Sequence, residues 1–272
     1  MIRFSAFVLA LSLSVSSFAA VEPTVGSLET TAPAPFSKIN VDLFGWSYSN
    51  SFSQWDGLRA SADGSSRGPV EIISQWQIHT PLFGSMDLVV MPQVKLQPTM
   101  GVLFQAQDVT AGIQGSVASS GGFSYWARYE LAFPLSQGSA KDGLITAPQS
   151  VNSVAYQFPG TKVKLEGVLV PSLKFFNNGE QSFFLYASPR LYYLASDSFW
   201  VMSILETSWE AARGKALSTF SRLDPPTLGI GVRYTTLNGR GMYVQPFFNV
   251  YPWGTDVANS AHLGVMFGGP IL

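Results

Sequence analysis

The sequence contains no cysteine, only two histidines and little charge. Of its 272 residues 12% are charged, about half of the roughly 25% found in an ordinary soluble domain. Without cysteine no disulfide can hold the fold, so an exported chain of this kind depends on hydrogen bonds and packing. Two histidines and no cysteine leave few ligands for a transition metal, and we expect neither a metal nor another cofactor.

Long apolar runs and an excess of charge of one sign are also lacking. Beyond the first 20 residues, no stretch approaches the roughly 18 consecutive apolar residues of a transmembrane helix. The net charge is −1, which gives no electrostatic reason to expect a nucleic-acid partner.

Residues 1–19 have the features of a secretory signal peptide: Arg3, an apolar core over 4–15, and small residues Ser17 and Ala19 before the expected cleavage. The alternative is a membrane anchor, for which the apolar core is too short.

What the sequence does contain is a strict alternation of two kinds of face. Between residues 122 and 134 the odd positions are all uncharged, whereas Arg128 and Glu130 fall on even positions. Residues 86–97 repeat the pattern, with Asp87 and Lys95 on one parity only. Side chains alternate across a strand with period two, so each segment has one uncharged face and one face that carries ions. In an exported chain this pattern predicts a transmembrane β-barrel with lipid outside and a polar lumen inside.

Twelve segments fit such a strand, which predicts an all-β, antiparallel, up-and-down barrel over residues 38–267. The connections alternate between short and long, as the periplasmic turns and external loops of outer-membrane barrels do. The weakest segment is 150–158, so ten or fourteen strands remain alternatives. Residues 20–37 are predicted to be a flexible periplasmic arm and 268–272 a tail. The twelve segments are 38–49, 69–80, 86–97, 106–117, 122–133, 150–158, 161–176, 181–195, 198–210, 226–237, 241–251 and 256–267.

The long connections are expected at 50–68, 98–105, 135–149 and 211–225, and two-residue or similar tight hairpins at Asn238-Gly239 and 177–179. The charged strand positions then all share one face, apart from Lys38 at a strand start. An Arg or Lys facing mid-bilayer lipid costs about 2–4 kcal/mol, so a membrane barrel requires this segregation. The inward face is predicted to carry Asp42, Glu71, Asp87, Asp108, Glu130, Glu166, Glu206, Glu210, Lys95, Arg128, Lys162, Lys164, Lys174, Arg190 and Arg233.

Eight of these are our candidate lumen-lining residues: Lys95, Arg128, Glu130, Lys164, Glu166, Arg190, Glu206 and Arg233. The two signs are nearly balanced, which predicts either stabilising ion pairs or a passage with weak ion selectivity. Several aromatic side chains also have inward parity, where they stack on solutes or fill a narrow lumen. A soluble β-sandwich or lipocalin-like barrel has the same alternation with the apolar face turned inward, and periodicity alone does not separate the two.

No catalytic constellation is evident. His79 and His262 both have inward parity and are far apart in the chain. Ser260 lies two positions before His262, in the reverse order of the lipid-cleaving outer-membrane barrels and on the other face. Glu206 and Glu210 are about 13 Å apart along a strand, too far for a glycosidase pair. We therefore expect no enzyme.

The signal, the alternating strands over 38–267 and the last strand, 257–267 with aromatic Phe267, resemble the Gram-negative outer-membrane β-barrels. The chain departs from their pattern by continuing past Phe267 to Leu272. The resemblance implies a place in the outer membrane, contact with its lipid and lipopolysaccharide, and insertion by the barrel-assembly machinery. We expect a passive channel for small hydrophilic solutes. The alternatives are a closed structural barrel that presents loops 50–68 and 211–225, and a lipid-modifying enzyme.

Overall fold

The computed structural model describes residues 38–50, 71–97, 102–215, 219–235, 242–250 and 262–270, and within these ranges the chain is almost entirely antiparallel β-structure. One short helix, α2 (Gln137–Lys141), interrupts it. The strands are β1 (Asn40–Asn50), β2 (Glu71–Phe83), β3 (Met86–Met91), β4 (Gln93–Gln97), β5 (Val102–Ala106), β6 (Val109–Ser120), β7 (Phe123–Phe133), β8 (Leu144–Gln157), β9 (Val163–Phe176), β10 (Gln181–Leu194), β11 (Phe199–Ala211), β12 (Ser221–Thr235), β13 (Tyr243–Val250) and β14 (His262–Pro270).

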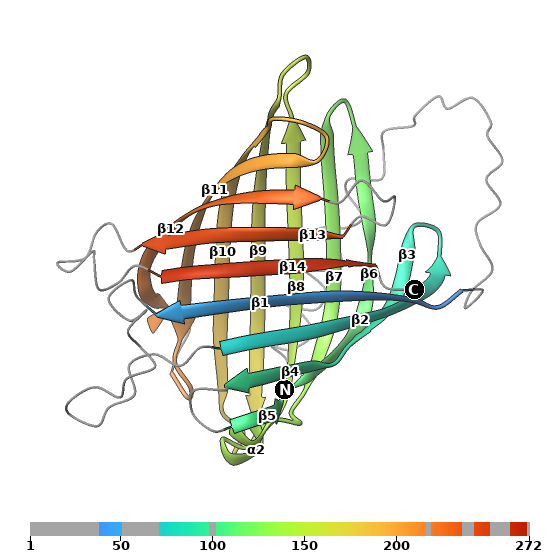
Figure 1. Ribbon diagram of the computed structural model, residues 1–272. Helices are drawn as coiled ribbons and strands as arrows, with labels where there is room; N and C mark the ends of the chain where they lie inside the picture. Colours follow the sequence, from blue (N-terminus) through green and yellow to red (C-terminus); the bar gives the residue numbers. More distant parts are fainter. Residues whose placement is uncertain are drawn as a thin grey trace, which may run out of the picture. The chain divides into compact units, whose positions relative to one another are not determined.

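The strands form a closed ring. Neighbouring strands are hydrogen-bonded, and β1 pairs with both β14 and β2, which closes the ring; among the described residues β5 pairs with β4 alone. β3 and β4 are halves of one strand interrupted at Pro92, and β5 and β6 are halves of another interrupted at Gln107 and Asp108. Trp76 N donates to Pro92 O at the first break and Gln107 N to Gln93 O at the second, each at 2.9 Å, so the ladder continues across both. With each interrupted strand counted once, the ring has twelve strands, which confirms the predicted antiparallel barrel. In Figure 1 the strands of the front wall cross those of the back wall steeply, as tilted barrel strands do.

The weakest predicted strand is present and longer than expected. β8 begins at Leu144 instead of residue 150, because Gln149 pairs with Glu130 on one side and Ser172 on the other. The predicted loop 135–149 is thus too long, and only 134–143 connects β7 to β8. The loops at 98–105 and 211–225 were also predicted too long, since β5 starts at Val102 and β12 at Ser221.

The end of the chain is part of the barrel wall. β14 continues to Pro270, with Gly268 and Gly269 opposite Phe44 and Leu43 of β1. The prediction that 268–270 form a tail is therefore wrong; the two glycines fit the seam where the last strand closes against the first. Residues 1–37, which hold the predicted signal and arm, and the hairpin at Asn238-Gly239 lie outside the described residues.

Short and long connections sort to opposite ends of the barrel. Gly84 turns β2 into β3 and Gly121 with Gly122 turns β6 into β7, all with positive φ. We call this the short-turn end; the opposite, long-loop end carries α2 and residues 212–215. The predicted hairpin at 177–179 is confirmed at the long-loop end, where Gly179 has φ +81° and Phe176 N donates to Glu180 O at 3.0 Å.

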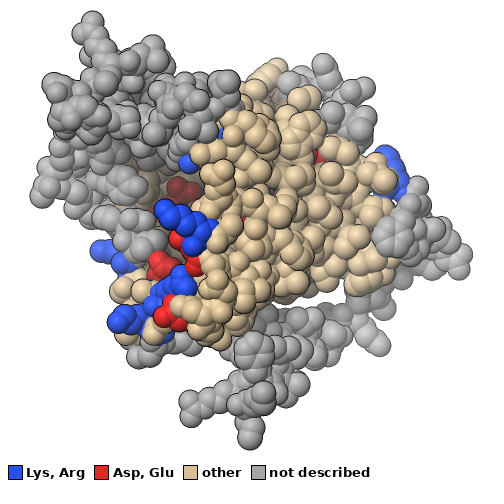
Figure 2. Space-filling model, turned by 90° about the horizontal axis from the view of Figure 1, so that it is seen from below, with Lys and Arg blue, Asp and Glu red and all other residues tan. Residues whose placement is uncertain are grey.

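The apolar face of the barrel points outward. On β9 the outward Leu165 and Leu169 are 45% and 44% exposed, while Glu166 between them faces the interior beside Ser153. Ile230 of β12 is 55% exposed and Glu130 of β7 only 5%. Figure 2 accordingly shows a broad surface almost without charge beside a region where charged residues gather. A soluble barrel or sandwich would bury its apolar face, so that alternative is wrong.

Among the strand side chains that the structure describes, the charge segregation has one exception, at a strand end. β12 starts earlier than predicted and so includes Arg222, which is opposite the outward-facing Trp209. Arg222 lies at the second position of the strand, at the long-loop end, where a charged side chain costs about 0–1 kcal/mol instead of the mid-bilayer penalty.

Side chains fasten the connections of the long-loop end to one another. Arg213 Nε lies 2.5 Å from Glu180 Oε2, Arg213 Nη1 donates to Asp142 O at 2.8 Å, and the guanidinium lies 4.1 Å from the centre of the Phe176 ring. Asp108 was predicted to face the lumen within a strand; it lies between β5 and β6 and accepts hydrogen bonds from Ser136 N and the Ser139 hydroxyl. It therefore holds the start of α2.

The contact between Arg213 and Glu180 predicts a pH-dependent stability. Hydrogen bonds from Asn178 and then Arg213 lower the pKa of Glu180 below its ordinary value. A carboxylate with a depressed pKa stabilises the fold above its unfolded pKa of about 4.3, and this contribution is lost as the pH falls through the folded value. We expect Arg213→Ala to lower the melting temperature in detergent at pH 7 and to lose its effect below pH 4. Lys215→Ala, the control for loss of a nearby loop cation, should change little at either pH; an Arg213→Ala effect that persists undiminished at acid pH would contradict the assignment.

Candidate functional site

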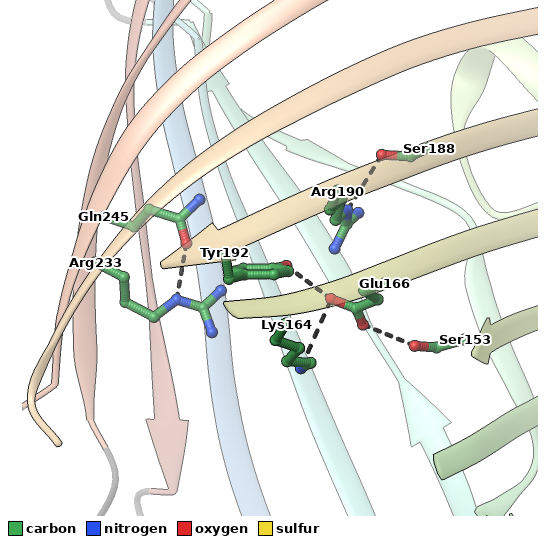
Figure 3. A network of polar contacts seen from close by, with 8 residues as sticks. All are labelled: Ser153, Lys164, Glu166, Ser188, Arg190, Tyr192, Arg233 and Gln245. Carbon is green, nitrogen blue, oxygen red and sulfur yellow. Dashed lines mark hydrogen bonds and ion pairs between the residues drawn. The ribbon is translucent and has the colours of Figure 1, made fainter. Parts of the chain in front are cut away.

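The interior of the barrel holds a hydrogen-bonded network centred on Glu166 of β9. Ser153 Oγ of β8 and Tyr192 Oη of β10 each donate to its carboxylate at 2.7 Å. Lys164 Nζ, two positions along the same strand face, lies 4.0 Å from the same carboxylate. Figure 3 shows these side chains converging from adjacent strands. Period-two alternation and the β9–β10 register together place them on one wall.

Arg190 of β10 lies directly opposite Glu166 in the ladder and points into the same space. Its Nε donates to Ser188 Oγ at 3.1 Å, and Ser188 itself is fully buried. This hydrogen bond fixes one edge of the guanidinium, and Tyr192 and Glu166 are further polar neighbours of the group.

A second arginine lies nearer the short-turn end. Arg233 Nε of β12 donates to Gln245 Oε1 of β13 at 2.8 Å, and Gln245 is 1% exposed. The guanidinium lies 4.2 Å from the centre of the Tyr243 ring and 5.8 Å from that of Trp200. Such distances allow an attraction between the cation and the face of each ring.

The aromatic rings connect the two groups of cations. Tyr192 and Trp200 pack edge to face with centroids 5.9 Å apart. Lys164 Nζ lies 5.0 Å from the Tyr192 ring and 5.8 Å from the Trp200 ring. The inward aromatic rings of this wall therefore have a third role beside filling the lumen or stacking on a solute, since they hold the cations in place.

Arg128 and Glu130 form a separate ion pair on β7. Arg128 Nε lies 2.8 Å from Glu130 Oε2, and Gln149 Nε2 of β8 donates to the other carboxylate oxygen at 2.5 Å. The side chain of Glu130 is 1% exposed and that of Arg128 is 16% exposed. Both residues face inward as predicted, and their pairing makes them structural parts of the wall.

Glu206 of β11 lies at the edge of this network: it accepts a hydrogen bond from Tyr186 Oη at 2.5 Å, and Tyr186 also interacts with Ser188 and Arg190. The other inward charged residues lie apart from it. Lys95 lies on the inward face of β4, opposite Ile73 of β2. Lys162 falls in the β8–β9 turn, where its Nζ donates to Ala195 O at 3.0 Å, so its predicted place within a strand is wrong.

A cluster that the sequence did not predict as a unit lies on β1, β2 and β3. His79 Nδ1 is 2.7 Å from Asp87 Oδ2, and Nε2 is 3.3 Å from Asp42 Oδ2. Both ring nitrogens face carboxylates, so this histidine presents no free nitrogen to a metal. In the described part of the chain, no group of three metal-ligating side chains is arranged to hold an ion.

On the inner face of the adjacent strands β7, β8, β9 and β10 lies an open cavity of about 400 Å³. Its lining combines an indole face, a hydroxyl and two opposite charges with small apolar side chains. The residues that line it are Trp126, Val151, Ser153, Glu166, Val168 and Arg190.

Sequence parity placed Lys164, Glu166, Arg190 and Arg233 on the inward face, and the structure brings the first three together. Parity missed the uncharged partners Ser153, Ser188 and Gln245, because a buried serine or glutamine has no distinctive spacing. The Ser260 and His262 pair, from which we expected no catalysis, is not tested: Ser260 lies outside the described residues, as does the side chain of His262.

The described residues include no helix long and apolar enough to cross a membrane. No protein-family model matches the chain, and no curated protein is similar to it in sequence.

Solved structures do share its architecture. An outer-membrane channel from Pseudomonas putida F1 is 10% identical, with a TM-score of 0.52 over 91% of this chain and 100% of that one. The NanC porin is 6% identical, with a TM-score of 0.48 over 84% and 98%, and a loop-deleted OmpT of Vibrio cholerae is 9% identical, with a TM-score of 0.43 over 86% and 98%. Together with the closed ring of strands, the match to the Pseudomonas putida structure shows that the chain has the fold of an outer-membrane β-barrel.

Proposed function

We propose that this protein is a passive channel for small hydrophilic solutes in the bacterial outer membrane. The observation that carries the proposal is the orientation of the two faces. Charged and hydroxylated side chains line the interior around a cavity of about 400 Å³, while the outward side chains are apolar and exposed. A wall of this kind suits lipid outside and water inside.

The mechanism is replacement of hydration along the wall. A solute that enters the lumen exchanges part of its water shell for hydrogen bonds to groups such as Ser153 and Arg190. The interior width of a barrel grows with its strand number. Twelve strands lie between the eight of barrels whose interiors fill with side chains and the roughly 16 of porins that enclose an aqueous channel. We therefore expect a narrow passage.

The absence of native cysteine makes the test direct. Val168 lines the cavity, and Leu169, the next residue, points outward and is 44% exposed. The refolded wild type should give steady ohmic steps in a planar bilayer. A negatively charged methanethiosulfonate should lower the conductance of Val168→Cys and leave that of the matched control Leu169→Cys unchanged. If the protein is folded and heat-modifiable but gives no current in the planar bilayer, the channel proposal is contradicted.

A closed structural barrel is the second candidate, favoured by the fastening of the long-loop end through Arg213 and Asp108. In that case the wild type would pass no current. We expect no catalysis; hydrolysis of phospholipid or lipid A that His262→Ala abolishes would contradict this expectation.

A further inference from the structure

Cations outnumber carboxylates on one wall of the lumen. Lys164, Arg190 and Arg233, which we call the cationic wall, lie on β9, β10 and β12. Lys164 and Arg190 lie beside the carboxylate of Glu166, which already accepts hydrogen bonds from two hydroxyl groups. The next carboxylate, that of Glu206 on β11, accepts a hydrogen bond from Tyr186. Of the ion pairs within 4.0 Å among the described residues, none involves Arg190 or Arg233.

The three cations lie at successive depths. Arg190 is level with Glu166, and Lys164 is opposite Tyr192, two residues closer to the short-turn end. Arg233 is opposite Trp200, closer again to that end. Two residues along a strand correspond to about 6.7 Å, so an anion that leaves one cation is already near the next.

We propose that the cationic wall is a binding path for small anions that carry a carboxylate or phosphate group, which leads from the short-turn end to the cavity beside Arg190. This proposal rests on the channel function and names the class of solute that the lumen retains. Each arginine is held at Nε by a neutral partner, Ser188 or Gln245. The terminal guanidinium nitrogens supply the paired donors that match a carboxylate or phosphate.

The cavity suits a compact acid better than a bare ion. Its volume of about 400 Å³ lies within the range of small-molecule sites, about 300–1,000 Å³. Trp126 offers a flat face and Ser153 a hydroxyl group beside Arg190. A solute with a ring, hydroxyl groups and one acidic group would therefore find an indole for its ring, a hydroxyl group for its hydroxyls and a guanidinium for its acid.

The acidic residues of the opposite wall favour this side for an anion. Asp42 and Asp87 flank His79 on β1, β2 and β3. β2 and β10 are six strands apart in the ring of twelve, so the acidic cluster and Arg190 belong to strands on opposite sides of the lumen. An anion is repelled by the acidic cluster and attracted by the cationic wall. Its path is therefore restricted, although positive and negative charges in the whole lumen are nearly balanced.

Block of single-channel current tests the proposal. The probes are glucuronate and inorganic phosphate as anions, with neutral glucose as the comparison. A unit charge about 6 Å away in water changes the local concentration of a monovalent ion about threefold. The triple variant Lys164→Gln/Arg190→Gln/Arg233→Gln should therefore weaken block by the anions about tenfold or more.

Lys174→Gln is the matched control, since it removes an inward cation from the same strand but outside the path, near Phe184. It should leave block unchanged. If the triple variant does not fold, Arg190→Gln and Arg233→Gln singly should each weaken block about threefold. Equal block of wild type and triple variant, or equal block by glucose, would overturn the anion path. Block by only one of the anions would support the path and identify its preferred acid.

A second experiment separates failure of the channel proposal from failure of the anion-binding proposal. If the wild type passes no current, tryptophan fluorescence of the detergent-refolded protein still reports binding near Trp126 and Trp200. Saturable quenching by glucuronate or phosphate that the triple variant loses would retain the anion site and reject conduction. No quenching would reject the anion site as well.

Discussion

Replacing Arg128 with methionine is expected to lower the free energy of unfolding by about 3–5 kcal/mol, since removal of one partner leaves a buried charge uncompensated. The partner is Glu130, whose side chain is 1% exposed and lies 2.8 Å from Arg128 Nε. Gln149 alone then faces the ionised carboxylate. Guanidinium unfolding of the detergent-refolded protein measures the loss.

Two further variants separate the ion pair from its parts. Arg128→Met/Glu130→Gln removes both charges and should recover most of the stability, because a neutral amide still hydrogen-bonds to Gln149. Arg233→Met removes a cation that has no carboxylate within 4.0 Å in the described chain and should cost only about 1 kcal/mol. Equal losses for Arg128→Met and the double variant would show that Glu130 is not left as an unpaired ion.

Replacing Gly112 with alanine is expected to destabilise the barrel wall strongly. Gly112 lies opposite Glu130, where a Cβ would be 1.9 Å from Tyr129 O and 2.7 Å from Glu130 Cα. These are backbone atoms of the neighbouring strand, so no side-chain rotation relieves the clash. Overpacking commonly costs about 1–3 kcal/mol, and this rigid case belongs at or above the upper end of that range.

Gly167→Ala is the control, because a Cβ at Gly167 of β9 has no atom within 4 Å. The yield of heat-modifiable barrel and the guanidinium midpoint should fall for Gly112→Ala and stay near wild type for Gly167→Ala. A Gly112→Ala barrel as stable as the wild type would mean that β6 and β7 separate there more easily than their pairing indicates.

Alternation alone predicted the strands in which both faces are distinct. β9 is the clearest case, because its charged residues Lys164, Glu166 and Lys174 share one parity and its exposed leucines the other. β8 was predicted too short because its first half, with Pro148 and Gln149, has loop-like composition. Only the pairing with β7 and β9 shows that it is extended.

The site was predictable residue by residue but not as an arrangement. Parity gives the face of a strand, whereas contact across strands also depends on register, which bulges shift. Thus Asp42, His79 and Asp87 each had inward parity, but their meeting follows from the register of β1, β2 and β3. Asp108 was misplaced because the strand breaks beside it and its carboxylate turns to α2.

The central claim is that the apolar face of the wall meets lipid and the charged face lines a water-filled lumen. Cysteines placed singly at Leu165, Val168, Leu169 and Val170 of β9 test it in outer membranes. With a charged, membrane-impermeant maleimide, we predict labelling at Val168 and Val170 and protection at Leu165 and Leu169 until detergent is added. Labelling at Leu165 and Leu169, with protection at the valines, would contradict the account.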